Sequence, residues 1–147
     1  MTPAYEPTNI FARILRGELP CHRICEDADC LAFMDIMPRA PGHALVIPKS
    51  PARTLLDVDP AALAKLALCV QKVAGAVKSA MSADGLTIQQ FNESAGGQVV
   101  FHLHVHIIPR WDGQPMRPHT SQMAPNDELA TNATLIRAAL QQAQAQE

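Results

Sequence analysis

The feature that most constrains this chain is a run in which apolar residues alternate with histidines. Residues 101–108 read Phe-His-Leu-His-Val-His-Ile-Ile. Because successive side chains of a β-strand point to opposite faces, a strand here places His102, His104 and His106 on one face and apolar side chains on the other. Successive histidines would then lie about 7 Å apart. The apolar face predicts a place in a core, whereas three imidazoles in register have no packing role and indicate chemistry.

A glycine-rich loop comes directly before this strand, in residues 92–98 (Asn-Glu-Ser-Ala-Gly-Gly-Gln). Adjacent glycines let main-chain N–H groups approach a ligand closely, and such amides suit an anion such as phosphate. A Gly-Gly pair by itself is usually a turn, but beside three histidines it favours a phosphate next to an imidazole. Two chemistries stay open at this point. They are zinc ligation by a His-x-His pair and nucleophilic catalysis by one imidazole.

The remaining pattern predicts an α+β fold. Extended runs are expected at residues 23–26, 30–35, 44–48, 86–91 and 101–108, with Pro109 ending the last of them. Three helices are expected: a short one capped by Thr8 or Asn9, a long one over residues 59–81, and one over residues 126–142. Residues 110–125 are proline-rich and predict an irregular arm. Strands that do not alternate with helices indicate a mostly antiparallel sheet with helices on one side.

Composition narrows the classes of partner. The 147 residues are 48% apolar and 18% charged, which is typical of one compact globular domain. A net charge of −2 and a pI near 6.3 leave no basic excess to hold a nucleic-acid backbone, so no such partner is expected. The apolar stretches look too short or too interrupted to span a bilayer, and no signal peptide is recognised. The chain is therefore expected to be cytoplasmic, with no membrane partner.

The four cysteines are Cys21, Cys25, Cys30 and Cys69, and no two of them form a Cys-x-x-Cys pair. Without a secretory signal, disulfides are not expected. The spacing of Cys21, His22, Cys25 and Cys30 is irregular, which favours ordinary thiols over a zinc site.

Residues 102–108 match the His-φ-His-φ-His-φ-φ signature of the histidine triad family of nucleotide hydrolases and transferases, which this chain resembles. Blocks similar to family blocks, in family order, lie at residues 9–11, 26–27, 31–36, 41–49 and 96–98. The resemblance implies a five-stranded antiparallel sheet with one long helix and short flanking helices, usually paired into a homodimer. It implies a domain core over residues 1–111, with the arm and C-terminal helix of residues 112–147 packed on the same domain.

The resemblance also implies a role for each site residue. His104 would attack the α-phosphorus of a nucleoside phosphoramidate or adenylate, and water would then release a purine mononucleotide such as AMP from the nucleotidyl-histidine. His106 would contact the phosphate and leaving group, supported by His102 and His43. Neither a metal nor a cofactor is implied. The implied nucleotide-binding residues are Asp35 at the ribose, Ile10, Phe11 and Ile36 at the base, and Asn92, Gly97 and Gln98 at the ribose or phosphate.

Two positions depart from the family pattern. Val99 stands where relatives often have a serine or threonine that contacts the phosphate or leaving group, so slower turnover is expected. Many bacterial relatives hold a structural zinc through a cysteine pair and a later histidine. Here Asn9 and Ala12 stand in place of the cysteines, and Ser50 and Pro51 in place of the histidine, so no such zinc is expected.

Three other functions stay open beside a Hint-like phosphoramidase. A diadenosine polyphosphate hydrolase would share the nucleophile, but the Pro41-Gly42-His43 block and residues 92–98 look more like the Hint-type branch. A zinc hydrolase using His102, His104 and His106 as ligands lacks an evident acidic base beside the strand. A non-catalytic nucleotide-binding module would not need all four histidines.

Overall fold

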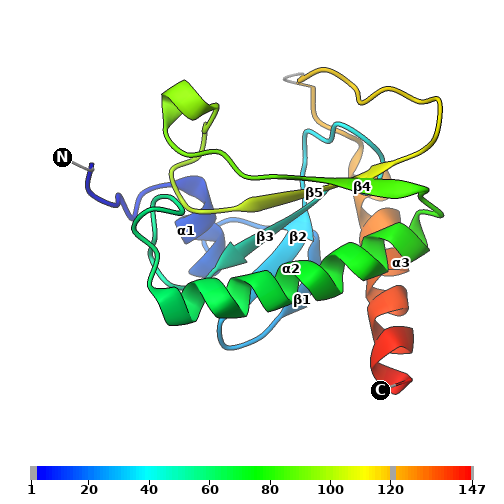
Figure 1. Cartoon of the computed structure of the whole chain (residues 1–147), viewed down its shortest axis with the longest axis horizontal. Helices are drawn as coiled ribbons and strands as arrows, with labels where there is room; N and C mark the ends of the chain where they lie inside the picture. Colours follow the sequence, from blue (N-terminus) through cyan, green and yellow to red (C-terminus); the bar gives the residue numbers. More distant parts are fainter. Residues whose placement is uncertain (1–2, 120–121, 147) are drawn as a thin grey trace.

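The structure, a computed structural model, describes residues 3–119 and 122–146. Its five strands form one antiparallel sheet in the order β1-β2-β3-β5-β4 (Figure 1), which confirms the predicted α+β class. The strands are β1 (Arg23–Glu26), β2 (Cys30–Met34), β3 (Ala44–Pro48), β4 (Gly85–Gln89) and β5 (Val105–Arg110). The helices are α1 (Ile10–Leu15), α2 (Pro60–Ala80) and α3 (Asn126–Ala145), with a 3-10 turn, η1, at Ser94–Gly96.

Helices cover both faces of the sheet rather than one, which corrects the sequence prediction. Alternate side chains of β2 and β3 point toward α1 and pack around Phe11; they are Leu31, Phe33, Leu45 and Ile47. The side chains between them, which include Ala32, Met34 and Val46, point the other way, into a larger core with α2 and α3 that also contains Ile107 of β5. The few apolar residues of the short helix do not reveal which face of the sheet it covers, so its position could not be predicted from the sequence.

Helix α2 begins where the sequence predicts. The Asp59 carboxylate accepts hydrogen bonds from the N–H groups of Ala61 and Ala62, and Pro60 occupies the first turn. The helix buries Leu66, Val73, Ala76 and Val77 against the sheet. By length and composition alone, α2 is also long and apolar enough to cross a membrane, with a mean hydropathy of 1.3. A core helix passes the same test when, as here, one face packs on a sheet.

The C-terminal helix is not a short flanking element. At 20 residues α3 is nearly as long as the 21-residue α2, and it continues past the expected end to Ala145. The extension follows from an alanine- and glutamine-rich end that favours helix. The helix packs against α2 and β1, burying Leu129, Ala133, Ile136 and Leu140.

The histidine strand begins later and ends later than expected. Residues 101–104 lie outside the sheet, because β3 pairs with β5 only from Ala44–Ile107 to Val46–Val105. Pro109 does not end the strand but pairs with Leu86 of β4. It lies beyond the last β3 pair, so its missing N–H removes no hydrogen bond from that ladder.

The arm between β5 and α3 is irregular, as expected, over the residues that the structure describes. It is held against the loop that follows β2, however. Arg117 N–H donates to the Arg39 carbonyl at 3.1 Å, and Ala124 N–H donates to the Ile36 carbonyl at 2.9 Å. The arm therefore borders the loop that carries the implied ribose and base residues.

All four cysteines are free thiols, as expected. Cys21 packs beside the α1 cluster, whereas Cys25 and Cys30 pack on the α2 side of the sheet. His22 points to Asn126 of α3, with 3.4 Å between His22 Nε2 and the Asn126 side-chain oxygen. These residues therefore cannot converge on one zinc ion.

Candidate active site

The four histidines implied as catalytic lie together. His106 is paired with Leu45 of β3, and directly paired residues point to the same face, so its ring lies on the α1 side of the sheet. The ring centre of His106 is 5.0 Å from that of His104 and 5.2 Å from that of His43. All four imidazoles, including His102, are buried. Strand β3, strand β5 and residues 101–104 together position this group.

The hydrogen bond of His104 fixes which of its nitrogens can react. Nδ1 of His104 lies 2.6 Å from the main-chain carbonyl oxygen of His102. A carbonyl only accepts, so Nδ1 carries the proton and donates. Nε2 of His104 is then left with a free lone pair. Phe11 packs edge-on against this ring at 4.9 Å between centres, which holds its orientation.

A second chain of hydrogen bonds fixes His106. Arg39 N–H donates to Nδ1 of His43 at 3.0 Å, so the His43 proton is on Nε2. Nε2–H of His43 donates in turn to Nδ1 of His106 at 2.9 Å. The proton of a neutral His106 therefore lies on its Nε2. The site thus presents one imidazole lone pair, on His104, beside one imidazole N–H, on His106.

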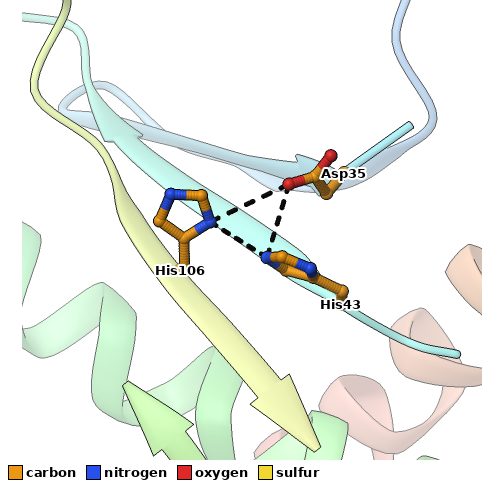
Figure 2. Close-up of side chains that lie close together, drawn as sticks. All are labelled: Asp35, His43 and His106. Carbon is orange, nitrogen blue, oxygen red and sulfur yellow. Dashed lines mark hydrogen bonds and ion pairs between the residues drawn. The ribbon is translucent and has the colours of Figure 1, made fainter. Parts of the chain in front are cut away.

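Asp35 lies at the edge of this network, where β2 ends. Figure 2 shows its carboxylate facing His43 and His106, with Oδ2 3.4 Å from His43 Nε2 and 3.8 Å from His106 Nδ1. The other oxygen, Oδ1, accepts from Met37 N–H at 2.9 Å. Within residues 3–119 and 122–146, Oδ2 therefore has no short hydrogen bond, and it is able to accept from a ligand hydroxyl.

Burial sets the protonation states. It lowers the pKa of His43 to about 2, of His106 to about 3 and of His102 to about 4. The pKa of His104 is lowered too, also by burial, although its bond to the His102 carbonyl opposes the shift. Burial raises the pKa of Asp35 to about 6. All four imidazoles are therefore neutral at pH 7, so Asp35 forms no charged ion pair with His43 or His106.

Asp35, His43 and His106 form the one group of potential metal ligands found among the described residues. Their hydrogen bonds do not fit a metal ion. To coordinate through Nε2, His43 would have to carry its proton on Nδ1, where it would face the N–H of Arg39. The triad does not fit zinc either, because both nitrogens of His102 are engaged, by Tyr5 and by the Pro48 carbonyl. The hydrogen-bond geometry of His43 and His102 therefore does not support a zinc hydrolase.

The residues implied at the base differ in exposure. Ile10 and Ile36 are exposed apolar side chains, at 46% and 40%, on α1 and on the loop after β2. Phe11, at 6%, lies beneath His104 and against Phe33. Ile10 and Ile36 are thus free to cover an apolar ligand face, whereas Phe11 supports the histidine.

The loop before the triad is tied internally. The Gln98 side chain accepts from Glu93 N–H and donates to the carbonyls of Arg53 and Val100. The N–H groups of residues 96–98 donate to Glu93 and Ser94 carbonyls within the loop. Gln98 therefore shapes the loop in this structure, and these amides do not form the open phosphate cradle that the glycines suggested.

Asn92 and Gly97 also have structural roles in this loop. Asn92 Oδ1 accepts from Leu55 N–H at 2.9 Å and from the Gln90 side-chain amide. Gly97 has a φ of +99°, and a Cβ there would lie 3.3 Å from the Phe91 ring. Glycine is therefore favoured at position 97 by its positive φ, and a Cβ there would require the Phe91 ring to shift slightly.

Three contacts of the site were not foreseen from the sequence. The Tyr5 hydroxyl hydrogen-bonds the His102 ring, and Arg39 N–H donates to the His43 ring. The Arg53 guanidinium forms a forked ion pair with Glu93 and stacks over Phe101, with its Cζ 4.2 Å from the ring centre. No spacing in the sequence links these residues to the triad, because each contact joins distant segments or a main-chain atom.

Comparison with known proteins identifies the family. The family model described as HIT domain matches residues 16–113. A relative in Mycobacterium tuberculosis, the uncharacterized HIT-like protein Rv1262c, is 35% identical over 90% of this chain and 93% of its own length. Adenylylsulfatase HINT3 of Arabidopsis thaliana is 36% identical over 78% of this chain, but the match spans only 61% of that protein.

Solved structures of similar proteins have the same fold. A Hit-like protein of Bartonella henselae is 52% identical, with a TM-score of 0.87 over 92% of this chain and 99% of that one. A zinc-bound histidine triad family protein of Mycobacterium smegmatis is 35% identical, with a TM-score of 0.85 over 95% and 98%. Together with the buried histidine network, these similarities show that the chain belongs to the histidine triad (HIT) family.

Proposed function

We propose that this chain is a Hint-like nucleotidyl hydrolase or transferase. It acts on purine nucleoside phosphoramidates or adenylates and releases the mononucleotide through a covalent intermediate on His104. The observation that carries the proposal is the hydrogen bond from His104 Nδ1–H to the His102 carbonyl, which leaves Nε2 as a nucleophile. Family membership supports nucleotide chemistry in general.

The chemistry has two steps. Nε2 of His104 forms a bond to the α-phosphorus, and the bond from phosphorus to the leaving nitrogen or oxygen breaks. Water then adds to phosphorus and the bond to His104 breaks. Overall, water supplies the hydroxyl of the mononucleotide and a proton to the leaving group. Nε2–H of His106 donates a hydrogen bond to the phosphoryl group as negative charge develops, which is the kind of fixed donor that stabilises such transition states.

The nucleoside end is assigned to Asp35 and the two exposed isoleucines. Asp35 Oδ2 would accept from the ribose hydroxyls, while Ile10 and Ile36 would pack on the base. Asn92, Gly97 and Gln98 keep the loop beside the phosphate in shape through the contacts described above. This arrangement needs no metal ion.

The leaving group is the less defined half of the substrate. The name of the Arabidopsis relative specifies an adenylylsulfatase, which supports an adenylyl group on this chain's substrate as well. Val99, 82% exposed, offers no hydroxyl to a leaving group. A diadenosine polyphosphate hydrolase would use the same His104 chemistry and remains the second candidate.

A homodimer is part of the proposal. The strand order leaves β4 at one end of the sheet, and Ile88 on that strand is 47% exposed. Unpaired edge strands invite pairing with another chain. A second copy joined at β4 would continue the sheet.

The test is AMP release from a panel comprising adenosine phosphoramidate, an aminoacyl-adenylate, adenylylsulfate and a diadenosine polyphosphate, each with and without a chelator. The phosphoramidate or adenylates should be cleaved, independently of chelator. His104→Ala should be inactive yet still bind AMP, whereas His22→Ala, whose ring points to Asn126, should be unaffected. Preference for the dinucleotide would overturn the branch assignment, and zinc-restored activity after chelation would favour a zinc hydrolase.

A further inference from the structure

The N-terminal segment reaches the triad through Tyr5. The Tyr5 hydroxyl lies 2.7 Å from Nδ1 of His102, and the two rings meet edge to face with centres 5.6 Å apart. The segment is anchored to α1, because Asn9 donates twice to the Glu6 carbonyl and Arg16 donates to the Pro7 carbonyl. Tyr5 is thus held in place rather than resting loosely on the surface.

The direction of the Tyr5 hydrogen bond follows from the other side of the ring. Nε2 of His102 lies 2.8 Å from the Pro48 carbonyl oxygen, which can only accept, so the ring proton is on Nε2. Nδ1 is then an acceptor, and Tyr5 O–H must donate to it. Because His102 is completely buried, loss of this donor would leave a buried nitrogen without a protein partner.

The carbonyl that orients His104 belongs to the same residue. His102 lies in residues 101–104, which are outside the β ladder, so sheet pairing does not hold its main chain. The nearby anchors are Leu103 N–H, which donates to the Ala52 carbonyl at 2.8 Å, and the His102 ring, which is fixed by Pro48 and Tyr5. A displaced His102 ring would therefore move the carbonyl that orients His104.

We infer that Tyr5 is a positioning residue for the nucleophile: its hydroxyl holds His102, and the His102 carbonyl holds His104 in the tautomer that exposes Nε2. The inference rests on the proposed function for its effect on turnover. Its structural part, one fixed tautomer for His102 and for His104, does not depend on which substrate is cleaved. The N-terminal segment thereby becomes part of the catalytic unit.

The test compares Tyr5→Phe, which keeps the ring and removes the hydroxyl, with wild type. Thr8→Val is the control, because it removes an exposed hydroxyl from the same segment. We expect Tyr5→Phe to lower kcat about tenfold with little change in KM, since misplacing a reacting group affects turnover more than binding. Thr8→Val should match wild type.

Nitrogen-15 NMR of the imidazoles provides the second readout. Wild type should show His102 only as the Nε2–H tautomer and His104 only as the Nδ1–H tautomer, and Tyr5→Phe should show mixtures. Single tautomers in Tyr5→Phe with kcat within twofold of wild type would overturn the inference. If wild type cleaves nothing in the substrate panel, the proposed function fails, and unchanged or mixed tautomers still decide the role of Tyr5.

Discussion

Nδ1–H of His104 donates to the main-chain carbonyl of His102, two residues earlier, across 2.6 Å. This short contact is possible because residues 101–104 leave the sheet, which frees the carbonyl from pairing with a neighbouring strand. The consequence is an imidazole that is neutral and oriented, with its lone pair on Nε2. The chemistry of the site therefore depends on where the ladder of β5 begins.

Acid should destabilise this protein strongly. His43, His106 and His102 have folded-state pKa values of about 2, 3 and 4, below the unfolded value near 6.5. Their contribution to stability is complete above pH 6.5 and is lost as pH falls below it, because unfolding then takes up protons. Each contributes up to about 1.4 kcal/mol per pH unit. Asp35, with a raised pKa of about 6, opposes this trend below pH 6 as one group against three.

Urea unfolding at pH values between about 7 and 5 measures this slope. The free energy of unfolding should fall in proportion to the protons taken up, and His43→Gln should reduce the slope by about one proton. A free energy of unfolding that does not change over this range would contradict the protonation states assigned to the network.

Asp35→Asn should weaken nucleotide binding without weakening the fold. The amide oxygen can still accept from Met37 N–H, but the charged acceptor for ribose is lost, which is expected to raise KM about tenfold or more. Because the raised pKa means that burial disfavours the charge, the variant should be at least as stable as wild type at pH 7. Asp29→Asn, at a solvent-exposed carboxylate, is the control for both measurements. An unchanged KM would remove Asp35 from the ribose site.

Val99→Ser should increase phosphoramidase turnover. A hydroxyl beside the developing charge is worth on the order of tenfold or more in rate when it is well placed. Val99→Ala separates this effect from a change in bulk, since it shortens the side chain and adds no donor. Steady-state kinetics on an adenosine phosphoramidate should give Ser faster than Val, with Ala similar to Val. Equal rates for all three would show that position 99 does not contact the reacting group.

The dimer proposal predicts sedimentation as a dimer at micromolar concentration, with β4 at the interface. Ile88→Lys should produce monomers, because a lysine on an edge strand blocks pairing. Leu135→Lys on α3 is a matched control, since Leu135 is 46% exposed against 47% for Ile88. A monomeric wild type, or dissociation by the Leu135 variant alone, would contradict this interface.

The sequence predicted the sheet and the histidine cluster well, because both depend on local periodicity. Alternation in residues 101–108 correctly separated the histidine face from Leu103 and Ile107 in the core. The predicted start of the strand was wrong because residues 101–104 leave the sheet before β3 ends: pairing with β5 stops at Val46–Val105, although β3 continues to Pro48. Pro109 does not end the strand, because proline disrupts a strand only where its missing N–H would face a partner.

The contacts that support the histidine cluster could not be predicted from the sequence, for a different reason. Tyr5 and His102 are 97 residues apart, and Arg39 acts through its main-chain N–H, which any residue except proline provides. Gln98 was expected at the ligand because amides bind phosphates and sugars. In the structure it bonds main-chain groups on both sides of the loop, which only the folded conformation brings together.

The central claim is that His104 Nε2 becomes covalently bonded to phosphorus, and trapping that bond tests it directly. The enzyme is mixed with an adenosine phosphoramidate, quenched in base because phosphohistidine bonds are labile in acid, digested and analysed by mass spectrometry. The account predicts an adenylyl group on His104 itself, absent from His104→Ala and unaffected by a chelator. An adenylyl group on another residue, or turnover by His104→Ala near the wild-type rate, would contradict it.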